Sequence, residues 1–198
     1  MAYSGGLTRE QFMFSEMRIT ARLKQSGLSD KEILDKVYQE NLFQYPTEKE
    51  IKSKCKACLK RIKAIEGMPI IMNALADGTV AEAKQATLIA MMCQSQLLAE
   101  FMVTVIGTKY RTLDMTITKK DMNMFFQYLQ QTDEDVASWS DNTIYKLKVV
   151  FRTCLRETGY IQGVGSEELL PVYLPEEFIQ DMKDAGLSSW LPAFNVLD

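Results

Sequence analysis

The chain has 198 residues, of which 46% are hydrophobic and 25% are charged, and this composition fits a folded domain rather than a disordered segment. Its 23 basic and 26 acidic residues leave a net charge of −3, so bulk electrostatics do not indicate nucleic-acid binding, although a local basic patch can still hold a polyanion. The sequence contains no histidine, which removes the commonest general base and metal ligand and makes an enzyme the least expected class of protein.

Helix-start and helix-stop signals recur along the chain. At five places a Ser or Thr is followed three residues later by an acid or an amide, which predicts a capped helix N-terminus at Thr8, Ser29, Thr47, Thr79 and Thr118. Glycines that suit helix ends stand at Gly27, Gly67, Gly78, Gly107 and Gly159. The expected helices cover residues 8–26, 30–41, 47–66, 69–77, 80–93, 95–110, 118–131, 134–139 and 141–158. We therefore predict an all-α, compact, multi-helix globular protein.

The strongest local signal is the helix expected over 47–66. Seven basic and two acidic residues lie between Thr47 and Lys63, a local net charge of +5. At about 3.6 residues per turn, apolar residues such as Ile51 and Cys55 share one face. The opposite face carries Lys49, Lys52, Lys56, Lys60 and Lys63. With the preceding helix, this helix has the outline of a helix-turn-helix over about 30–66, and we expect its lysines to contact DNA. A solvated amphipathic helix is the alternative reading of the same pattern.

The most apolar stretch, residues 86–107, is interrupted by Cys93-Gln94-Ser95-Gln96 and by Glu100. It therefore falls short of the roughly 18 uninterrupted apolar residues of a membrane span, and we expect two buried core helices and no membrane contact. The N-terminal residues MAYSGGLTREQF lack the pattern of a signal peptide, and the four cysteines show no disulfide framework. These features predict a cytoplasmic protein.

A second candidate site begins at Thr118, where a helix, a very short helix and a longer helix follow one another in the order of a winged helix-turn-helix. Residues 160–166 and 169–173 surround a glycine-containing turn and predict a short β-hairpin near 160–173 as the wing. We expect an N-terminal helical region over 1–112 and a winged-helix-like region over 113–198, packed as one compact unit. A helical bundle with a structural hairpin is the alternative.

The helix that begins near Asp141 is the expected DNA-reading helix of this second site. Asn142 and Thr143 stand at its start, near the base edges of a bound duplex. Further side chains expected to contact DNA are Lys119, Lys120, Tyr145, Lys146, Lys148, Arg152 and Arg156.

Two remaining patterns indicate structure rather than chemistry. Cys55-Lys56-Ala57-Cys58 is a CxxC, but the sequence offers no second CxxC and no histidine to complete a zinc site, so we expect two buried thiols. Gly5-Gly6 and Gly163-Val164-Gly165 lack the context of a phosphate-binding loop. The sequence therefore predicts no catalytic site, no metal, no cofactor and no small-molecule substrate.

Several long strings of the sequence carry a family resemblance: YSGGLTREQFMFSEMRITARL, ENLFQYPTE, GTVAEAKQATLIAMMCQSQLLAEFMVTVIGTKY, ITKKDMNMFF and ASWSDNTIYKLKVVFRTCLRETGYI. In them the chain resembles the BrxA family, the small component of type I BREX phage-exclusion systems, over nearly its whole length. The resemblance implies an all-α protein with two helix-turn-helix units and no catalytic activity, which binds double-stranded DNA. It also implies that the protein acts together with a methyltransferase, an ATPase and an alkaline-phosphatase-like protein. The resemblance identifies no individual functional residues.

These observations predict a non-enzymatic accessory protein that holds double-stranded DNA mainly through phosphates, with weak sequence preference. Two alternatives stay open. One is a protein–protein adaptor within the defence complex, and the other is an RNA-binding protein like the antitermination factor NusB, to which the family has been likened.

Overall fold

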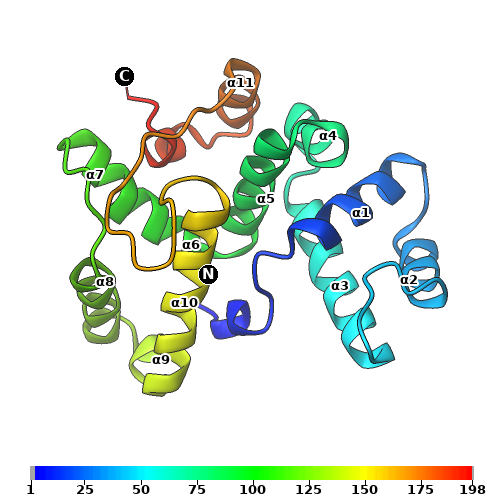
Figure 1. The fold of residues 1–198 in the computed structure, drawn as a ribbon, viewed down its shortest axis with the longest axis horizontal. Coiled ribbons are helices and arrows are strands. Elements are labelled where there is room, and N and C mark those ends of the chain that lie inside the picture. The colour runs from blue at the N-terminus through cyan, green and yellow to red at the C-terminus, as the bar shows by residue number, and fades with distance from the viewer. Residues whose placement is uncertain (1–2, 198) are drawn as a thin grey trace. The chain divides into compact units, whose positions relative to one another are not determined.

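The structure is a computed structural model and describes residues 3–197 (Figure 1). Its α-helices are α1 (Phe14–Gln25), α2 (Asp30–Gln39), α3 (Glu48–Ala64), α4 (Pro69–Asp77), α5 (Val80–Gln94), α6 (Gln96–Phe101), α7 (Gly107–Arg111), α8 (Lys119–Thr132), α9 (Glu134–Ala137), α10 (Asp141–Glu157) and α11 (Glu176–Asp184). The 3-10 helices η1 (Gly5–Thr8) and η3 (Ser188–Phe194) lie near the chain ends, and a π-helical turn, η2 (Met102–Ile106), joins α6 to α7. Every regular element in residues 3–197 is thus helical, which confirms the all-α prediction.

The chain divides into two compact units. Unit 2 runs from Met13 to Gln94, and unit 1 combines the residues up to Phe12 with those from Ser95 onward. The chain therefore leaves unit 1 after its first residues and returns to it about eighty residues later, a discontinuous arrangement. The boundary expected near residue 112 falls inside unit 1, between α7 and α8.

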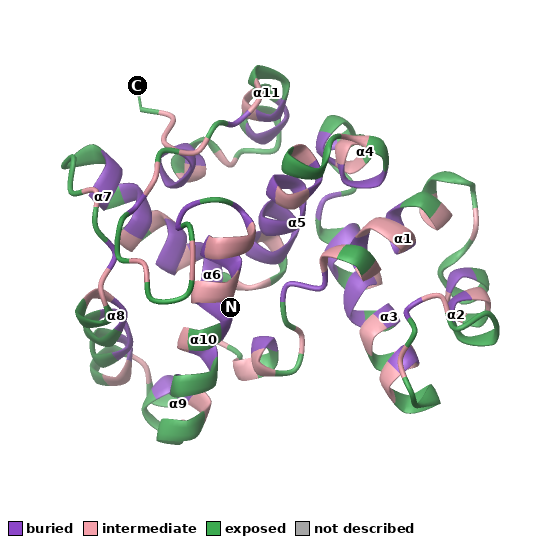
Figure 2. Ribbon diagram, in the orientation of Figure 1, coloured by how far each residue is buried: buried purple, intermediate pink, exposed green. Residues whose placement is uncertain are grey.

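Unit 2 contains α1 to α5. Helix α1 packs against α3 and α4, and α2 packs against α3. A core formed by Ile33, Val37, Phe43, Ile51 and Cys55 holds α2, the following connector and α3 together. Buried residues follow one side of α3 and exposed residues follow the other (Figure 2), as its sequence periodicity predicts.

Unit 1 contains α6 to α11 and the 3-10 and π-helical turns. Its centre holds a cluster of four phenylalanine rings, in which Phe101 lies 4.8 Å from Phe151 and 5.4 Å from Phe125 between ring centroids, and Phe126 lies 5.7 Å from Phe151. Tilted and edge-on pairs at these distances are the favoured aromatic arrangements. The cluster fixes α8 and α10 against α6, and this packing positions the side chains of the second candidate site.

Three local predictions are wrong, each because packing overrides a local signal. Thr8 does not cap a helix: its hydroxyl donates to the Gly5 carbonyl within η1, and α1 begins only at Phe14, where the chain passes into unit 2. Gly107 does not end a helix but lies at the start of α7, where a Cβ atom would come within 3.2 Å of the Ala193 nitrogen. A close approach of two backbones therefore explains this glycine.

The third wrong prediction is the β-hairpin near 160–173. The glycine-containing turn forms, with Gly165 at φ +85°, but its two arms do not pair as strands. Glu168 instead forms an isolated antiparallel bridge with Thr116, flanked by backbone hydrogen bonds from Ile117 to Glu167 and from Leu169 to Met115. One backbone hydrogen bond, from Leu170 to Tyr160, still joins the two arms, and the segment before α8 supplies the neighbouring backbone partners that a hairpin would have provided itself.

Among residues 3–197, no single helix combines the length and the apolar character needed to cross a membrane. The two consecutive helical stretches 80–94 and 96–111 meet that criterion only when they are taken together, across the break between them.

Candidate functional site

Helix α3 carries the first group of predicted site residues. Its N-terminus is capped by Thr47, whose hydroxyl accepts a hydrogen bond from the Glu50 amide at 3.3 Å. Cys55, Cys58 and Ile62 are fully or almost fully buried, which anchors one face of the helix in unit 2. The opposite face is consequently turned to solvent, as the sequence predicts.

The lysines on this outer face differ in their partners. Lys49, Lys56, Lys60 and Lys63, here called the lysine stripe, are exposed and lie within about 60° of the helix circumference at 100° per residue. Within the part of the chain that the structure describes, none of these four ammonium groups has a carboxylate or hydrogen-bond partner. The stripe is therefore an uncompensated row of positive charge.

Lys52 is the exception on this face. It forms an ion pair with Glu48 one turn earlier, and its ammonium lies 4.4 Å from the centroid of the Tyr38 ring. The hydrogen bond to Glu48 raises the pKa of Lys52 and lowers that of Glu48. Lys52 is thus already engaged within unit 2, by Glu48 at a spacing of four residues that the sequence shows and by the Tyr38 ring of α2, which only the fold brings beside it.

The connector between α2 and α3 spans residues 40–47. Asn41 stabilises it by donating to the Tyr45 carbonyl and accepting from the Tyr45 amide, and Phe43 inserts into the core. The turn of a helix-turn-helix usually has about three to four residues, so this connector is longer than usual. Helix α2 packs against α3 and holds it in place. The assignment of this pair as a helix-turn-helix stays a prediction.

Helix α10 carries the second group. Ser140 caps it, and Ile144, Leu147, Phe151 and Cys154 are buried, which matches the predicted inward face. On the other side, Tyr145 is 66% exposed and Lys146 is exposed, whereas Lys148, Arg152 and Arg156 are half-buried.

The three cations spaced four residues apart on α10 each have a partner. The Lys148 ammonium donates to Asn123 Oδ1 at 2.7 Å and lies 5.6 Å from the centroid of the Phe126 ring, and its burial lowers the pKa of the group. Arg152 donates from Nη2 to the Ser166 carbonyl at 2.6 Å. Arg156 contacts the Glu157 carboxylate at 3.4 Å. Only the last of these partners carries a negative charge.

A groove of about 820 Å³ separates α8 from α10, and we call it the α8–α10 groove. Of the predicted site residues, Lys119, Tyr145, Lys148 and Arg152 line it, together with apolar side chains from both helices. Three amide side chains that the sequence reading missed also line it, namely Asn123, Gln127 and Gln130. Their spacing of four and three residues on one predicted helix was the available signal.

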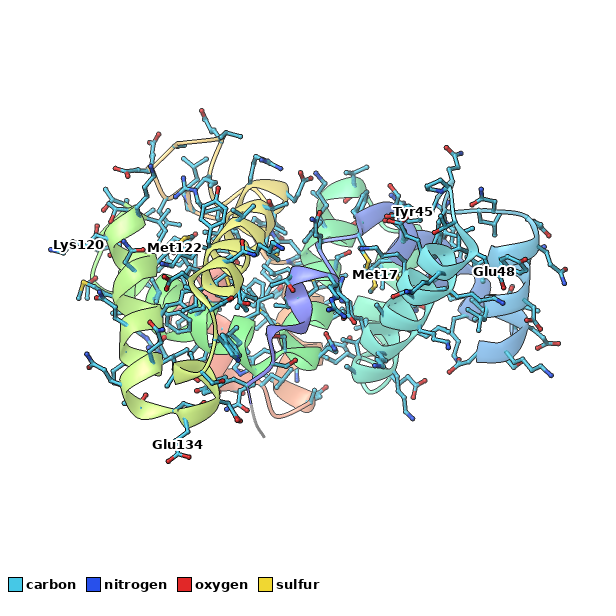
Figure 3. The ribbon with its side chains drawn as sticks, turned by 90° about the horizontal axis from the view of Figure 1, so that it is seen from below. Met17, Tyr45, Glu48, Lys120, Met122 and Glu134 are labelled. Carbon is cyan, nitrogen blue, oxygen red and sulfur yellow. The ribbon has the colours of Figure 1, made fainter. Side chains whose placement is uncertain are left out.

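The other predicted residues of unit 1 lie outside the groove lining. Lys120 projects outward from α8, whereas Met122 points toward the interior (Figure 3). Asn142 is exposed at the start of α10. Thr143 is half-buried, because its methyl group lies against Gly5 of η1 and its hydroxyl contacts Ser140.

The CxxC pair lies on the buried face of α3. Cys55 and Cys58 are free thiols and 0% exposed, and desolvation raises their pKa values to about 11 and about 12. Thiols in this state are poor nucleophiles and poor metal ligands. No group of three or more possible metal ligands occurs among residues 3–197.

The comparisons with known proteins agree on one family. The BrxA family model matches residues 1–186. A relative named BREX protein BrxA, from Bacillus cereus (strain H3081.97), is 30% identical over 185 residues, which cover 93% of this chain and 92% of the relative. A second protein of that name, from Escherichia coli O9:H4 (strain HS), is 22% identical over 176 residues, which cover 89% of this chain and 82% of that protein.

A solved structure supports the fold. The crystal structure of an uncharacterized protein from Magnetospirillum magneticum has a TM-score of 0.81 at 21% identity, and the match covers 98% of both chains. At this level of identity the likeness concerns the fold alone. The family model and the 30% identical relative establish the identity: this chain belongs to the BrxA family.

Proposed function

We propose that the protein is a non-enzymatic, double-stranded DNA-binding accessory component of a BREX phage-defence system. The single observation that carries DNA binding is the lysine stripe, Lys49, Lys56, Lys60 and Lys63, which is exposed and lacks carboxylate partners within residues 3–197. Like charges on one helix face repel one another by a few tenths of a kcal/mol per pair, and a polyanion removes that repulsion. The curated relatives carry the name BREX protein, which supports the defence setting.

The stripe suits phosphate contacts more than base recognition. Lysine ammonium groups are flexible point charges, and contacts from them to phosphates carry little sequence information. We therefore expect weak sequence preference and an affinity that falls steeply with salt. A methyltransferase, an ATPase and an alkaline-phosphatase-like protein are the proposed partner components of the system.

A salt titration of duplex affinity tests this proposal. The variant carrying Lys56→Gln and Lys60→Gln keeps helix propensity, because Gln and Lys are similar helix formers. If both lysines contact phosphates, the slope of log affinity against log salt falls by about two relative to wild type.

A matched control is the variant carrying Arg111→Gln and Lys183→Gln, which removes two exposed cations from α7 and α11. This control should keep the wild-type slope, since neither residue belongs to the stripe. If the two variants lose the same amount of duplex affinity, the effect reflects overall charge and the stripe is solvated surface.

A protein–protein adaptor is the second candidate function. It is favoured by Met124 and Tyr128, which lie one turn apart on α8, are 56% and 60% exposed, and do not line the α8–α10 groove. A protein that shows no duplex binding at low salt, while retaining its fold, would support the adaptor over the DNA-binding function. Competition with structured RNA separates the third alternative, RNA binding.

A further inference from the structure

The α8–α10 groove has the wrong shape for a duplex. Proteins read double-stranded DNA with a protruding helix or ribbon that enters a groove of the DNA. Here Tyr145, Lys148 and Arg152 of α10 instead line a hollow whose opposite wall is α8. A hollow between two helices accepts a single extended strand, as the grooves of single-strand-binding proteins do.

The cations in the groove remain available to an anion. Lys148 and Arg152 are held by the neutral oxygens of Asn123 and Ser166, so their positive charges are oriented but not neutralised. Arg152 Nη1 is buried and has no hydrogen-bond partner among residues 3–197. An unsatisfied buried donor is costly, and a phosphate in the groove meets the positive charge of this guanidinium rather than the buried nitrogen itself.

The groove also offers what unpaired bases require. Tyr145 is 66% exposed and lines the groove, so its ring is free to stack on a base. The amides of Gln127 and Gln130 provide both donors and acceptors for base edges, and Asn123, whose oxygen accepts from Lys148, provides its NH₂ donor. In a duplex the Watson–Crick edges of the bases are already paired, so only a single strand can offer those edges to the amides.

The charge of the groove is balanced more closely than that of the lysine stripe. Its three cations, Lys119, Lys148 and Arg152, are accompanied by two carboxylates, Asp141 and Glu167, which leaves a net charge of +1. Binding here depends on stacking and amide hydrogen bonds as much as on charge. Its dependence on salt is therefore expected to be shallower than that of binding at the stripe.

From these features we propose that the α8–α10 groove is a binding site for a short segment of single-stranded DNA, with Tyr145 stacking on a base and Lys148 and Arg152 contacting phosphates. The choice of DNA over RNA rests on the proposed function of the lysine stripe. The groove itself belongs wholly to unit 1, so its contribution is separable from that of α3.

Fluorescence anisotropy with a labelled oligonucleotide of about 10 nucleotides tests the site, with a duplex and an RNA of the same sequence as parallel arms. Tyr145→Ala should weaken single-strand binding roughly 10-fold, because stacking on one ring is lost, and should weaken duplex binding much less, because the duplex proposal rests on the lysine stripe of α3. Tyr145→Phe should retain the affinity. Tyr128→Ala is the matched control, since this tyrosine is also exposed, on α8, but lies outside the groove.

The outcomes separate this proposal from the proposed function. Loss of duplex binding in the Lys56 and Lys60 variant, with single-strand binding intact, supports two distinct sites. Failure of the wild-type protein to bind the single strand, or equal affinity of Tyr145→Ala and wild type, overturns the groove proposal and leaves the duplex proposal standing. Tighter binding of the RNA than of the DNA, with the same dependence on Tyr145, overturns the assignment to DNA.

Discussion

The five lysines on the outer face of α3 share one side of the helix in the sequence pattern, but their surroundings in the structure differ. Lys52 has Glu48 and the Tyr38 ring beside it, whereas Lys56 and Lys60 have no partner among the described residues. A cation that is already paired gains less from a new anion, because the existing contact must first be broken. The structure therefore shows the local Glu48–Lys52 pair and adds the Tyr38 contact, and both set Lys52 apart from the lysine stripe.

The cysteines of α3 provide a prediction at the residue scale. Burial raises the pKa of Cys55 to about 11 and that of Cys58 to about 12, so both thiols stay protonated at pH 8. Because the thiolate is the reactive species, iodoacetamide should not label either residue in the native protein at pH 8. Mass spectrometry of the treated protein measures this, with the same protein unfolded in guanidinium as the positive control. Rapid labelling of the native protein would contradict the buried, structural role.

At the scale of the helix, side-chain N-caps account for the starts of α2, α3, α5, α6, α8, α9 and α10. Ser29 and Thr118 each form a complete capping box with the acid three residues later, and Thr79 makes the same reciprocal contacts with Glu82. Thr8 has the same sequence signal, but the passage of the chain between the two units places a 3-10 turn there instead. A local signal is therefore decisive only where packing leaves the local backbone free to follow it.

Thr118→Ala tests the contribution of one cap. The substitution removes the hydroxyl that accepts from the Asp121 amide and should lower the free energy of unfolding by about 1 kcal/mol at pH 7. Chemical denaturation measures the change. Thr132→Ala at the end of the same helix is the control and should cost much less, because its hydroxyl only donates to the Tyr128 carbonyl of the preceding turn.

The effect of the Thr118 cap should also depend on pH. Burial acts to raise the pKa of Asp121, but hydrogen bonds from Thr118 and the nearby Lys109 outweigh it, and the net shift is downward from 3.8. A lowered pKa in the folded state stabilises the protein above the ordinary Asp pKa, and this stabilisation is lost as the pH falls through the lower, folded value. The difference between Thr118→Ala and wild type should therefore shrink below pH 3.8. A difference that is constant down to pH 2 would count against the carboxylate as part of the cap.

At the scale of the whole molecule, the discontinuous unit 1 is the main feature. The first residues of the chain belong to it, and Leu7 of η1 is only 3% exposed, with η1 packed against α10. Elements that adjoin η1 in the sequence, by contrast, belong to unit 2. The support of α10, which carries Tyr145, Lys148 and Arg152, thus depends on a segment more than a hundred residues away.

Leu7→Ala tests this dependence. Removal of a buried leucine side chain usually costs about 2–5 kcal/mol, and the cost should be concentrated in unit 1. Hydrogen exchange measured by mass spectrometry should show faster exchange in α10, with α1 to α4 unchanged. Val80→Ala, at a position that is 57% exposed in unit 2, serves as the control. Faster exchange in α1 to α4 but not in α10 would show that η1 stabilises unit 2 and would contradict the proposed role of η1 in supporting α10.

The sequence by itself determined the all-helical class, the capped starts of α2, α3, α5 and α8, and the division of α3 into a buried and a basic face. These features arise from hydrogen bonds and hydrophobic periodicity within a few residues, so they can be predicted from the sequence without knowing the tertiary contacts. Only the tertiary structure decided which cations gain a partner from another segment, why Gly107 is needed, and how residues 160–173 run. It also brought Asn123, Tyr145 and Gly165 to one groove. Such arrangements depend on contacts between segments distant in the sequence, which no local pattern records.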